Sequence, residues 1–99
     1  ERVPEPKNLI PKKKMVSVIK EMMILESHVQ ATYGQINRYY KVMQKSGDSL
    51  LATFELDRET YESSIDYYGS RQEEIKGIYT EALEQMNEDL GKLESNKSD

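Results

Sequence analysis

The stretch MVSVIKEMMILESHVQATY, residues 15–33, decides the fold class of this chain. Its apolar side chains recur at spacings of three and four: Met15, Val18, Ile19, Met22, Leu25, Val29 and Tyr33. That spacing places them on one face of an α-helix, which turns about 100° per residue. Pro11 suits a first helical position, because its missing N–H has no partner there. The sequence therefore predicts a helix that starts near Pro11 and packs one face against a core.

Two further helices are predicted towards the C-terminus. Asp57 precedes RETYESSIDYY and can cap the free N–H groups of a helix starting near Arg58, and Gly69 supplies a left-handed stop. Ser70 and Glu73 have the spacing of a capping box for the last helix. That helix carries one set of apolar residues on one side: Ile75, Ile78, Tyr79, Ala82, Leu83, Met86, Leu90 and Leu93.

The boundaries between these helices stay open. Gly34 is one candidate end, although helical periodicity continues through residues 35–45. KSGDSL, residues 45–50, is the clearest break, because Gly47 can stop one helix and Asp48 or Ser49 can cap another. No strand-like alternation occurs, so we predict an all-α fold, a compact bundle of three to four helices.

The length and composition of the chain limit the classes of function that it can have. The 99 residues fit one domain, which we divide into an extended leader or tether at 1–9, a helical domain at 10–94 and a frayed tail at 95–99. The leader is expected to be a spacer outside the core. The net charge of −4 comes from intermixed acids and bases, which argues against a nucleic-acid partner. The chain has no cysteine and therefore no disulfide or thiolate metal site.

The stretch ETYESSIDYYGS, residues 59–70, concentrates tyrosines on one short helix. Tyr61, Ile65 and Tyr68 fall within about 60° of one another, with Ser64 beside them and Tyr67 at the flank. We interpret this as a buried stripe rather than a ligand site, since buried tyrosines commonly keep their hydroxyls at the rim.

The methionines of this chain suggest a second possible function, the binding of a partner. Five occur, with Met22 and Met23 adjacent, and a flexible thioether suits an adaptable groove for a partner. Because Met15, Met22 and Met86 lie on predicted core stripes, we interpret them as core residues that fill gaps.

Glu26 is the anomaly of the first helix, because it falls between Met22 and Val29 within the apolar stripe. Burying a carboxylate is costly unless it is hydrogen-bonded. Three accounts remain open: an exposed stem at the core edge, a structural hydrogen bond, or proton-transfer chemistry. We predict a hydrogen bond to one of the two C-terminal helices, and the favoured partners are Tyr67, Tyr68 and Tyr79.

No catalytic, metal or cofactor site is predicted. His28 is the only histidine, it lies off the apolar stripe, and no second ligand stands at metal-binding spacing. We therefore expect it on the surface and predict a chain that is not an enzyme.

Four segments in order resemble a known family: PKNLIPKKKM, VIKEMMILES, LDRETYESSIDYYG and EIKGIYTEALEQM. They are similar to the small lipoproteins of unknown function found in Bacteroidetes-type bacteria. The matching positions are Pro6, Leu9, Ile10, Pro11, Met15, Glu21, Glu26, Tyr61, Ser64, Tyr67, Tyr68, Ile78 and Tyr79. The resemblance implies a lipid anchor upstream of this chain, a removed signal peptide and a place on the periplasmic side of the cell envelope.

Three function hypotheses follow. The first is a non-catalytic binding or assembly module whose partner is an envelope protein, touching the membrane only through that anchor. The second is a small-ligand binder or enzyme that uses Glu26 with Tyr67 and Tyr68. The third is a structural homo-oligomer, although the sequence does not determine the oligomeric state.

Overall fold

Four helices make up the protein, as the computed structural model shows for residues 3–32 and 36–97. They are α1 (Lys12–Thr32), α2 (Ile36–Thr53), α3 (Arg58–Gly69) and α4 (Gln72–Lys97). No strand occurs in the described part of the chain, so the all-α prediction is confirmed. The helix starts predicted near Pro11 and Arg58, and the start near Arg71 expected for the last helix, are also confirmed to within one residue.

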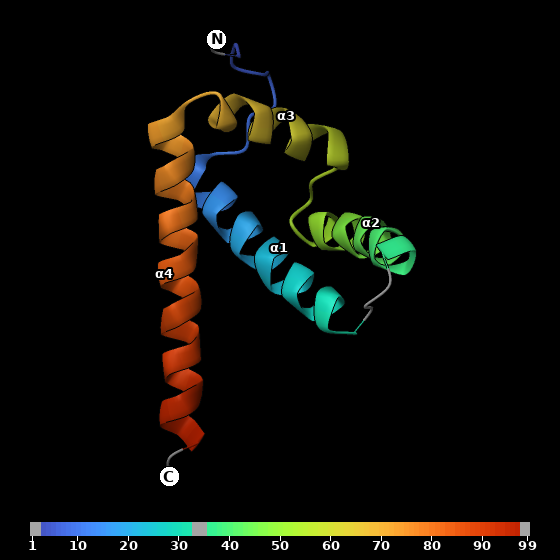
Figure 1. Cartoon of the computed structure of the whole chain (residues 1–99). Coiled ribbons are helices and arrows are strands. Elements are labelled where there is room, and N and C mark those ends of the chain that lie inside the picture. The colour runs from blue at the N-terminus through green and yellow to red at the C-terminus, as the bar shows by residue number, and fades with distance from the viewer. Residues whose placement is uncertain (1–2, 33–35, 98–99) are drawn as a thin grey trace.

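The four helices form the predicted compact bundle, in which the two outer helices stand apart (Figure 1). α1 packs against α2 on one side and α4 on the other, while α2 and α4 do not pack against each other. α3 crosses one end and packs against α2 and α4. The C-terminal end of α4 extends past the end of α1. A space therefore lies between α2 and α4, with α1 as its floor and α3 closing one end.

The core lies where the leader, α1, α3 and α4 meet. Its buried side chains are Ile10, Met15, Val16, Ile19, Tyr68, Ile78 and Ala82. Ile10 also brings backbone N–H and C=O groups into this core, and both need partners there. The Ile10 N–H donates to Ser64 Oγ at 3.0 Å, and the Tyr68 hydroxyl donates to the Ile10 carbonyl at 2.6 Å. Two residues of the predicted buried stripe of α3 therefore hold the backbone of Ile10, the residue that follows the leader.

The leader is docked, which differs from the spacer expected from its sequence. The Val3 N–H donates to Ser70 Oγ at 3.1 Å, and Arg71 Nη1 donates to the Val3 carbonyl at 3.0 Å. These bonds hold the leader over the corner between α3 and α4 (Figure 1). At the other end, α4 is helical as far as Lys97, inside the segment expected to fray.

The break predicted at KSGDSL is wrong, because α2 runs through it without interruption. Gly47 is buried at the α1–α2 contact, where a Cβ atom would lie 3.8 Å from Met22 Cε. That distance is an ordinary van der Waals contact, so Gly47 lies inside a continuous helix at a packing contact and does not end it. Gly34, the other candidate end, lies outside the described residues.

α2 ends instead in a Schellman motif that the sequence did not signal. The Glu55 N–H bonds the Ala52 carbonyl at 3.0 Å, and the Leu56 N–H bonds the Leu51 carbonyl at 2.9 Å. Glu55 takes the left-handed position with φ 60°, where glycine is usual.

Of the other predicted caps, one is confirmed and two are wrong. Asp57 caps α3, because its side chain accepts from the Thr60 N–H at 2.8 Å. Gly69 has no positive φ; the chain turns through Ser70 in a right-handed conformation. The predicted capping box does not form, since α4 begins at Gln72 and the Ser70 hydroxyl donates to the Tyr67 carbonyl.

Candidate functional site

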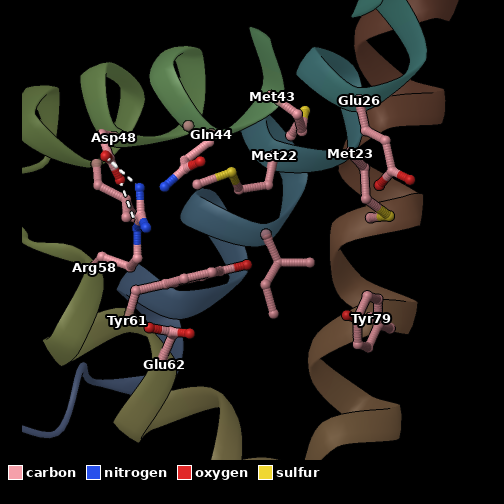
Figure 2. A pocket seen from close by; sticks show the side chains of 13 residues that line it. Met22, Met23, Glu26, Met43, Gln44, Asp48, Arg58, Tyr61, Glu62 and Tyr79 are labelled. Atoms are coloured by element: carbon pink, nitrogen blue, oxygen red, sulfur yellow. Dashed lines mark hydrogen bonds and ion pairs between the residues drawn. The ribbon is translucent and has the colours of Figure 1, made fainter. Parts of the chain in front are cut away.

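A groove of about 320 Å³ opens where the four helices meet. α1 lies behind it, α2 and α4 flank it, and α3 borders the remaining side (Figure 2). Its lining residues are Ile19, Met22, Met23, Glu26, Met43, Gln44, Gly47, Asp48, Leu51, Arg58, Tyr61, Glu62 and Tyr79.

Three methionines give the groove adaptable walls. Met22 and Met23 come from α1 and Met43 from α2, and all three are half-buried (Figure 2). Unbranched thioether side chains repack at low cost and suit surfaces that accept varied apolar partners. The sequence interpretation of Met22 as core filling was therefore incomplete, because the side chain also borders an open space.

An ion pair joins α2 to α3 at one side of the groove. Arg58 Nε donates to Asp48 Oδ1 at 3.0 Å, and Arg58 Nη2 donates to Asp48 Oδ2 (Figure 2). This two-bond geometry orients the guanidinium and raises the pKa of Arg58. Sequence reasoning missed the pair because its members lie on separate helices, with no regular spacing to connect them.

Tyr61 places the most distinctive polar group in the groove. Its ring comes from α3 and its hydroxyl points into the space between the helices (Figure 2). That hydroxyl has no hydrogen-bond partner among residues 3–32 and 36–97. Burial, followed by the nearby Tyr79 and Glu26, raises the pKa of Tyr61 to about 12. The hydroxyl therefore remains protonated at neutral pH and can donate to an incoming acceptor.

Glu26 makes a tyrosine hydrogen bond, but the predicted partner is wrong. The Tyr39 hydroxyl of α2 donates to Glu26 Oε1 at 3.1 Å, at an exposed position. Tyr79 also lines the groove but is not bonded to Glu26. Burial and this bond raise the pKa of Tyr39. The carboxylate thus links α1 to α2, rather than to either C-terminal helix.

Tyr67 and Tyr68 lie away from the groove, so the structure does not bring the four candidate residues together. The Tyr67 hydroxyl donates to Glu5 Oε1 at 3.5 Å, and its ring lies 3.9 Å below the Arg71 guanidinium carbon. The Tyr68 hydroxyl already donates its hydrogen bond to the Ile10 carbonyl. A site combining Glu26 with Tyr67 and Tyr68 therefore has no geometric basis.

Neither a metal-binding cluster nor a membrane-spanning helix occurs within residues 3–32 and 36–97. No group of three His, Cys, Asp or Glu side chains there could hold a metal ion. None of the described helices is long and apolar enough to cross a membrane. His28 is exposed on α1, as expected.

Comparison with sequence families gives one match: residues 6–91 match the domain of unknown function DUF4296. The chain belongs to this family. All residues lining the groove lie inside the matched range, so the groove is part of the DUF4296 domain itself. No curated protein and no solved structure matches this DUF4296 chain.

Proposed function

We propose that this DUF4296 domain is a non-catalytic binding module, and that its groove holds an apolar segment of an envelope protein. The observation that carries the proposal is the groove itself: apolar methionine walls around a tyrosine hydroxyl that no described residue engages. A ligand site commonly combines apolar walls with a few polar groups that fix orientation. Tyr61 would donate a hydrogen bond to a backbone carbonyl of the bound segment.

The charges around the groove favour a basic segment. Glu26 and Glu62 contribute carboxylates, and the third carboxylate, Asp48, is paired with Arg58. One positive charge thus faces three negative ones. Such an imbalance attracts a partner carrying lysine or arginine and discriminates against an acidic partner.

Methionine methyl NMR tests this binding mode directly. Met22, Met23 and Met43 line the groove, whereas Met15 is fully buried and Met86 lies on α4 outside it, so both act as internal controls. The probe is an acetylated, amidated hexapeptide of alternating leucine and lysine, with the leucine–glutamate hexapeptide as its matched control. We expect saturable shifts of the three groove methyls with the lysine peptide only.

Two variants sharpen the titration. Glu62→Gln should weaken binding of the lysine peptide by removing one charge, and Tyr61→Phe should weaken it by removing the donor. Ser63→Ala, on α3 but outside the lining, is the control and should leave affinity unchanged. Shifts of equal size with both peptides would contradict the charge argument, and no shift of the groove methyls would contradict the proposed site.

The cellular setting rests on the family resemblance in sequence. We propose that the full-length protein is a lipoprotein held on the periplasmic side of the envelope. Metabolic labelling with a radioactive fatty acid, followed by membrane fractionation, tests this placement. An unlabelled protein recovered in a soluble fraction would contradict it.

A further inference from the structure

α2 stands outside the core that joins the other three helices. Among the described residues, none of those that form or border the core cluster lies on α2. Over the same part of the chain α2 and α4 make no packing contact, although both flank the groove. Within residues 38–53 only Gly47 and Leu51 are buried. One wall of the groove therefore belongs to a helix that the core does not hold in place.

Two exposed polar links connect α2 to its neighbours. The Tyr39 hydroxyl donates to Glu26 of α1 at 3.1 Å, near the N-terminal end of α2. Further along α2, the Asp48 carboxylate accepts two hydrogen bonds from Arg58, the first residue of α3. In the described part of the chain, Arg58 alone carries the polar link from α3 to α2. The hydrogen bonding between these two helices therefore depends on one guanidinium group.

The Arg58 guanidinium is held by two α2 side chains that lie one helical turn apart. Gln44 and Asp48 are four residues apart, so they lie on the same face of α2. With its amide oxygen turned towards Arg58, Gln44 accepts from Nη1 at 2.9 Å. All three side chains line the groove, and Figure 2 shows Arg58 reaching from α3 towards the two α2 residues. We call these three residues the α2 latch, because they join the α2 wall of the groove to its α3 border.

A helix attached in this way can pivot on α1 while the core stays intact. We propose that α2 is a movable wall of the groove and that the α2 latch sets the width of the groove. With the latch closed, α2 is held beside α3, as in this structure. With the latch open, α2 turns away from α4 and the groove widens, which is a hinge motion of one helix. This regulation acts on the site of the proposed function and rests on that function for its purpose.

The latch lies in contact with water and is therefore easy to open. The Arg58 and Asp48 side chains are 42% and 50% exposed. Exposed ion pairs are weak, and dissolved salt screens them. Segments with few buried contacts also open at a lower free energy than the whole fold. We therefore expect α2 to exchange between the two positions, with the balance shifted by ionic strength and by a bound segment.

The methionines of the groove suit a wall that moves. Met43 moves with α2, whereas Met22 and Met23 stay with α1. Flexible thioether side chains can keep contact with a bound segment at more than one width of the groove. The state of the latch then sets the size of the apolar side chain that the groove accepts.

Distances between spin labels on engineered cysteines measure the pivot, since the chain has no cysteine of its own. Labels at Lys45→Cys and Glu84→Cys, exposed positions of α2 and α4 outside the lining, report the width of the groove. Labels at Ser27→Cys and Glu84→Cys report the placement of α1 relative to α4. Asp48→Ala opens the latch without lowering helix propensity. We expect it to lengthen and broaden the α2–α4 distances and to leave the α1–α4 distances unchanged.

A matched variant and a salt series separate the latch from general loosening. Glu62→Gln removes a carboxylate that also raises the pKa of Arg58, but this residue lies on α3 and should leave the α2–α4 distances unchanged. The wild type in about 1 M salt should approach the distances of Asp48→Ala. If Asp48→Ala loses its helical spectrum, the salt series of the wild type decides alone. Unchanged α2–α4 distances on opening the latch, or an equal lengthening of the α1–α4 distances, would overturn the proposal.

These distances are measured without peptide, so the latch and the proposed function can fail separately. Addition of the leucine–lysine hexapeptide should narrow the α2–α4 distance distribution, because a bound segment selects one width of the groove. Distances that respond to Asp48→Ala but not to the peptide would support the latch and contradict the proposed function. Distances that ignore Asp48→Ala, while the peptide still shifts the groove methyls, would contradict the latch alone.

Discussion

Tyr61 and Tyr68 lie seven residues apart on the same stripe of α3, yet they meet opposite surroundings. Tyr68 is only 3% exposed and its hydroxyl donates to the Ile10 carbonyl at 2.6 Å. Tyr61 reaches an open groove, and no described residue accepts a hydrogen bond from its hydroxyl. The two side chains are chemically identical, so their roles are assigned by what surrounds each hydroxyl.

The comparison shows where a binding site arises in this fold. Ile10, which directly follows the leader, is buried in the same core cluster as Tyr68 and supplies the acceptor. Beside Tyr61 the walls of the space are α2 and α4, which do not pack against each other. Polar groups that stabilise the fold therefore lie where segments meet, and the candidate binding group lies where they fail to meet.

The largest expected effect follows from removing the buried tyrosine. Tyr68→Ala should lower the free energy of unfolding by about 3–5 kcal/mol, because it deletes a core ring together with the donor to Ile10. Tyr40→Ala, at a 65% exposed ring, is the control and should change it little. Urea unfolding measures both variants, and equal small losses would mean that the contact between Tyr68 and Ile10 does not stabilise the fold.

A subtler pair of changes isolates the hydroxyls. Tyr68→Phe should cost about 1–3 kcal/mol, because the Ile10 carbonyl would remain buried without a donor. Tyr61→Phe should leave stability nearly unchanged, since its hydroxyl bonds no described residue. Thermal melts of the two variants provide the measurement. A cost for Tyr61→Phe as large as that for Tyr68→Phe would remove the distinction between the two ends of α3.

Deleting the first residues of the leader tests whether its contacts with Ser70 and Arg71 also stabilise the fold. Deleting residues 1–5 removes the hydrogen bonds of Val3 with Ser70 and Arg71, both at exposed positions. We expect a loss of roughly 1 kcal/mol, the scale of ordinary exposed hydrogen bonds. Full stability of the shortened chain would support the free spacer that the leader sequence suggested.

The smallest effect is expected at alkaline pH. The pKa of Tyr61 is about 12, above the ordinary value of about 10. The folded state therefore retains a proton that the unfolded state releases, so stability is unaffected below pH 10 and falls as the pH rises from about 10 to about 12. Absorbance titration near 295 nm should show late-titrating tyrosines, because the pKa values of Tyr39 and Tyr68 are raised as well, and Tyr61→Phe should remove the component near pH 12. An unchanged titration curve in that variant would contradict the assignment.

Local signals in the sequence predicted most of the helices. The apolar spacing of residues 15–33 and the cap at Asp57 depend only on neighbours within one or two turns, and both are confirmed. The errors came at glycines. Gly47 was interpreted as a stop, but it is buried where α1 and α2 touch, and that contact leaves no local mark in the sequence.

The candidate site was less predictable than the fold. Glu26 was identified as unusual from its helical phase, but its partner Tyr39 lies on α2, whose boundaries the sequence left open. The Tyr61 side chain packs against the core as predicted, but helical phase gives only a direction from the helix axis and did not reveal that Tyr61 also lines an open groove. The Arg58–Asp48 pair likewise depends on how α2 and α3 are placed.

The sequence by itself determined the all-α class, the faces along which α1, α3 and α4 present apolar side chains, and membership of the DUF4296 family. Tertiary structure alone decided which of those faces are covered. α1 has neighbours on two sides, and Ile10 covers Tyr68 at one end of α3. Tyr61 near the other end of α3 borders the open groove, and Leu83 and Leu90 of α4 are exposed. The physical reason is that helical periodicity arises from bonds between residues four apart, whereas burial depends on segments distant in the chain.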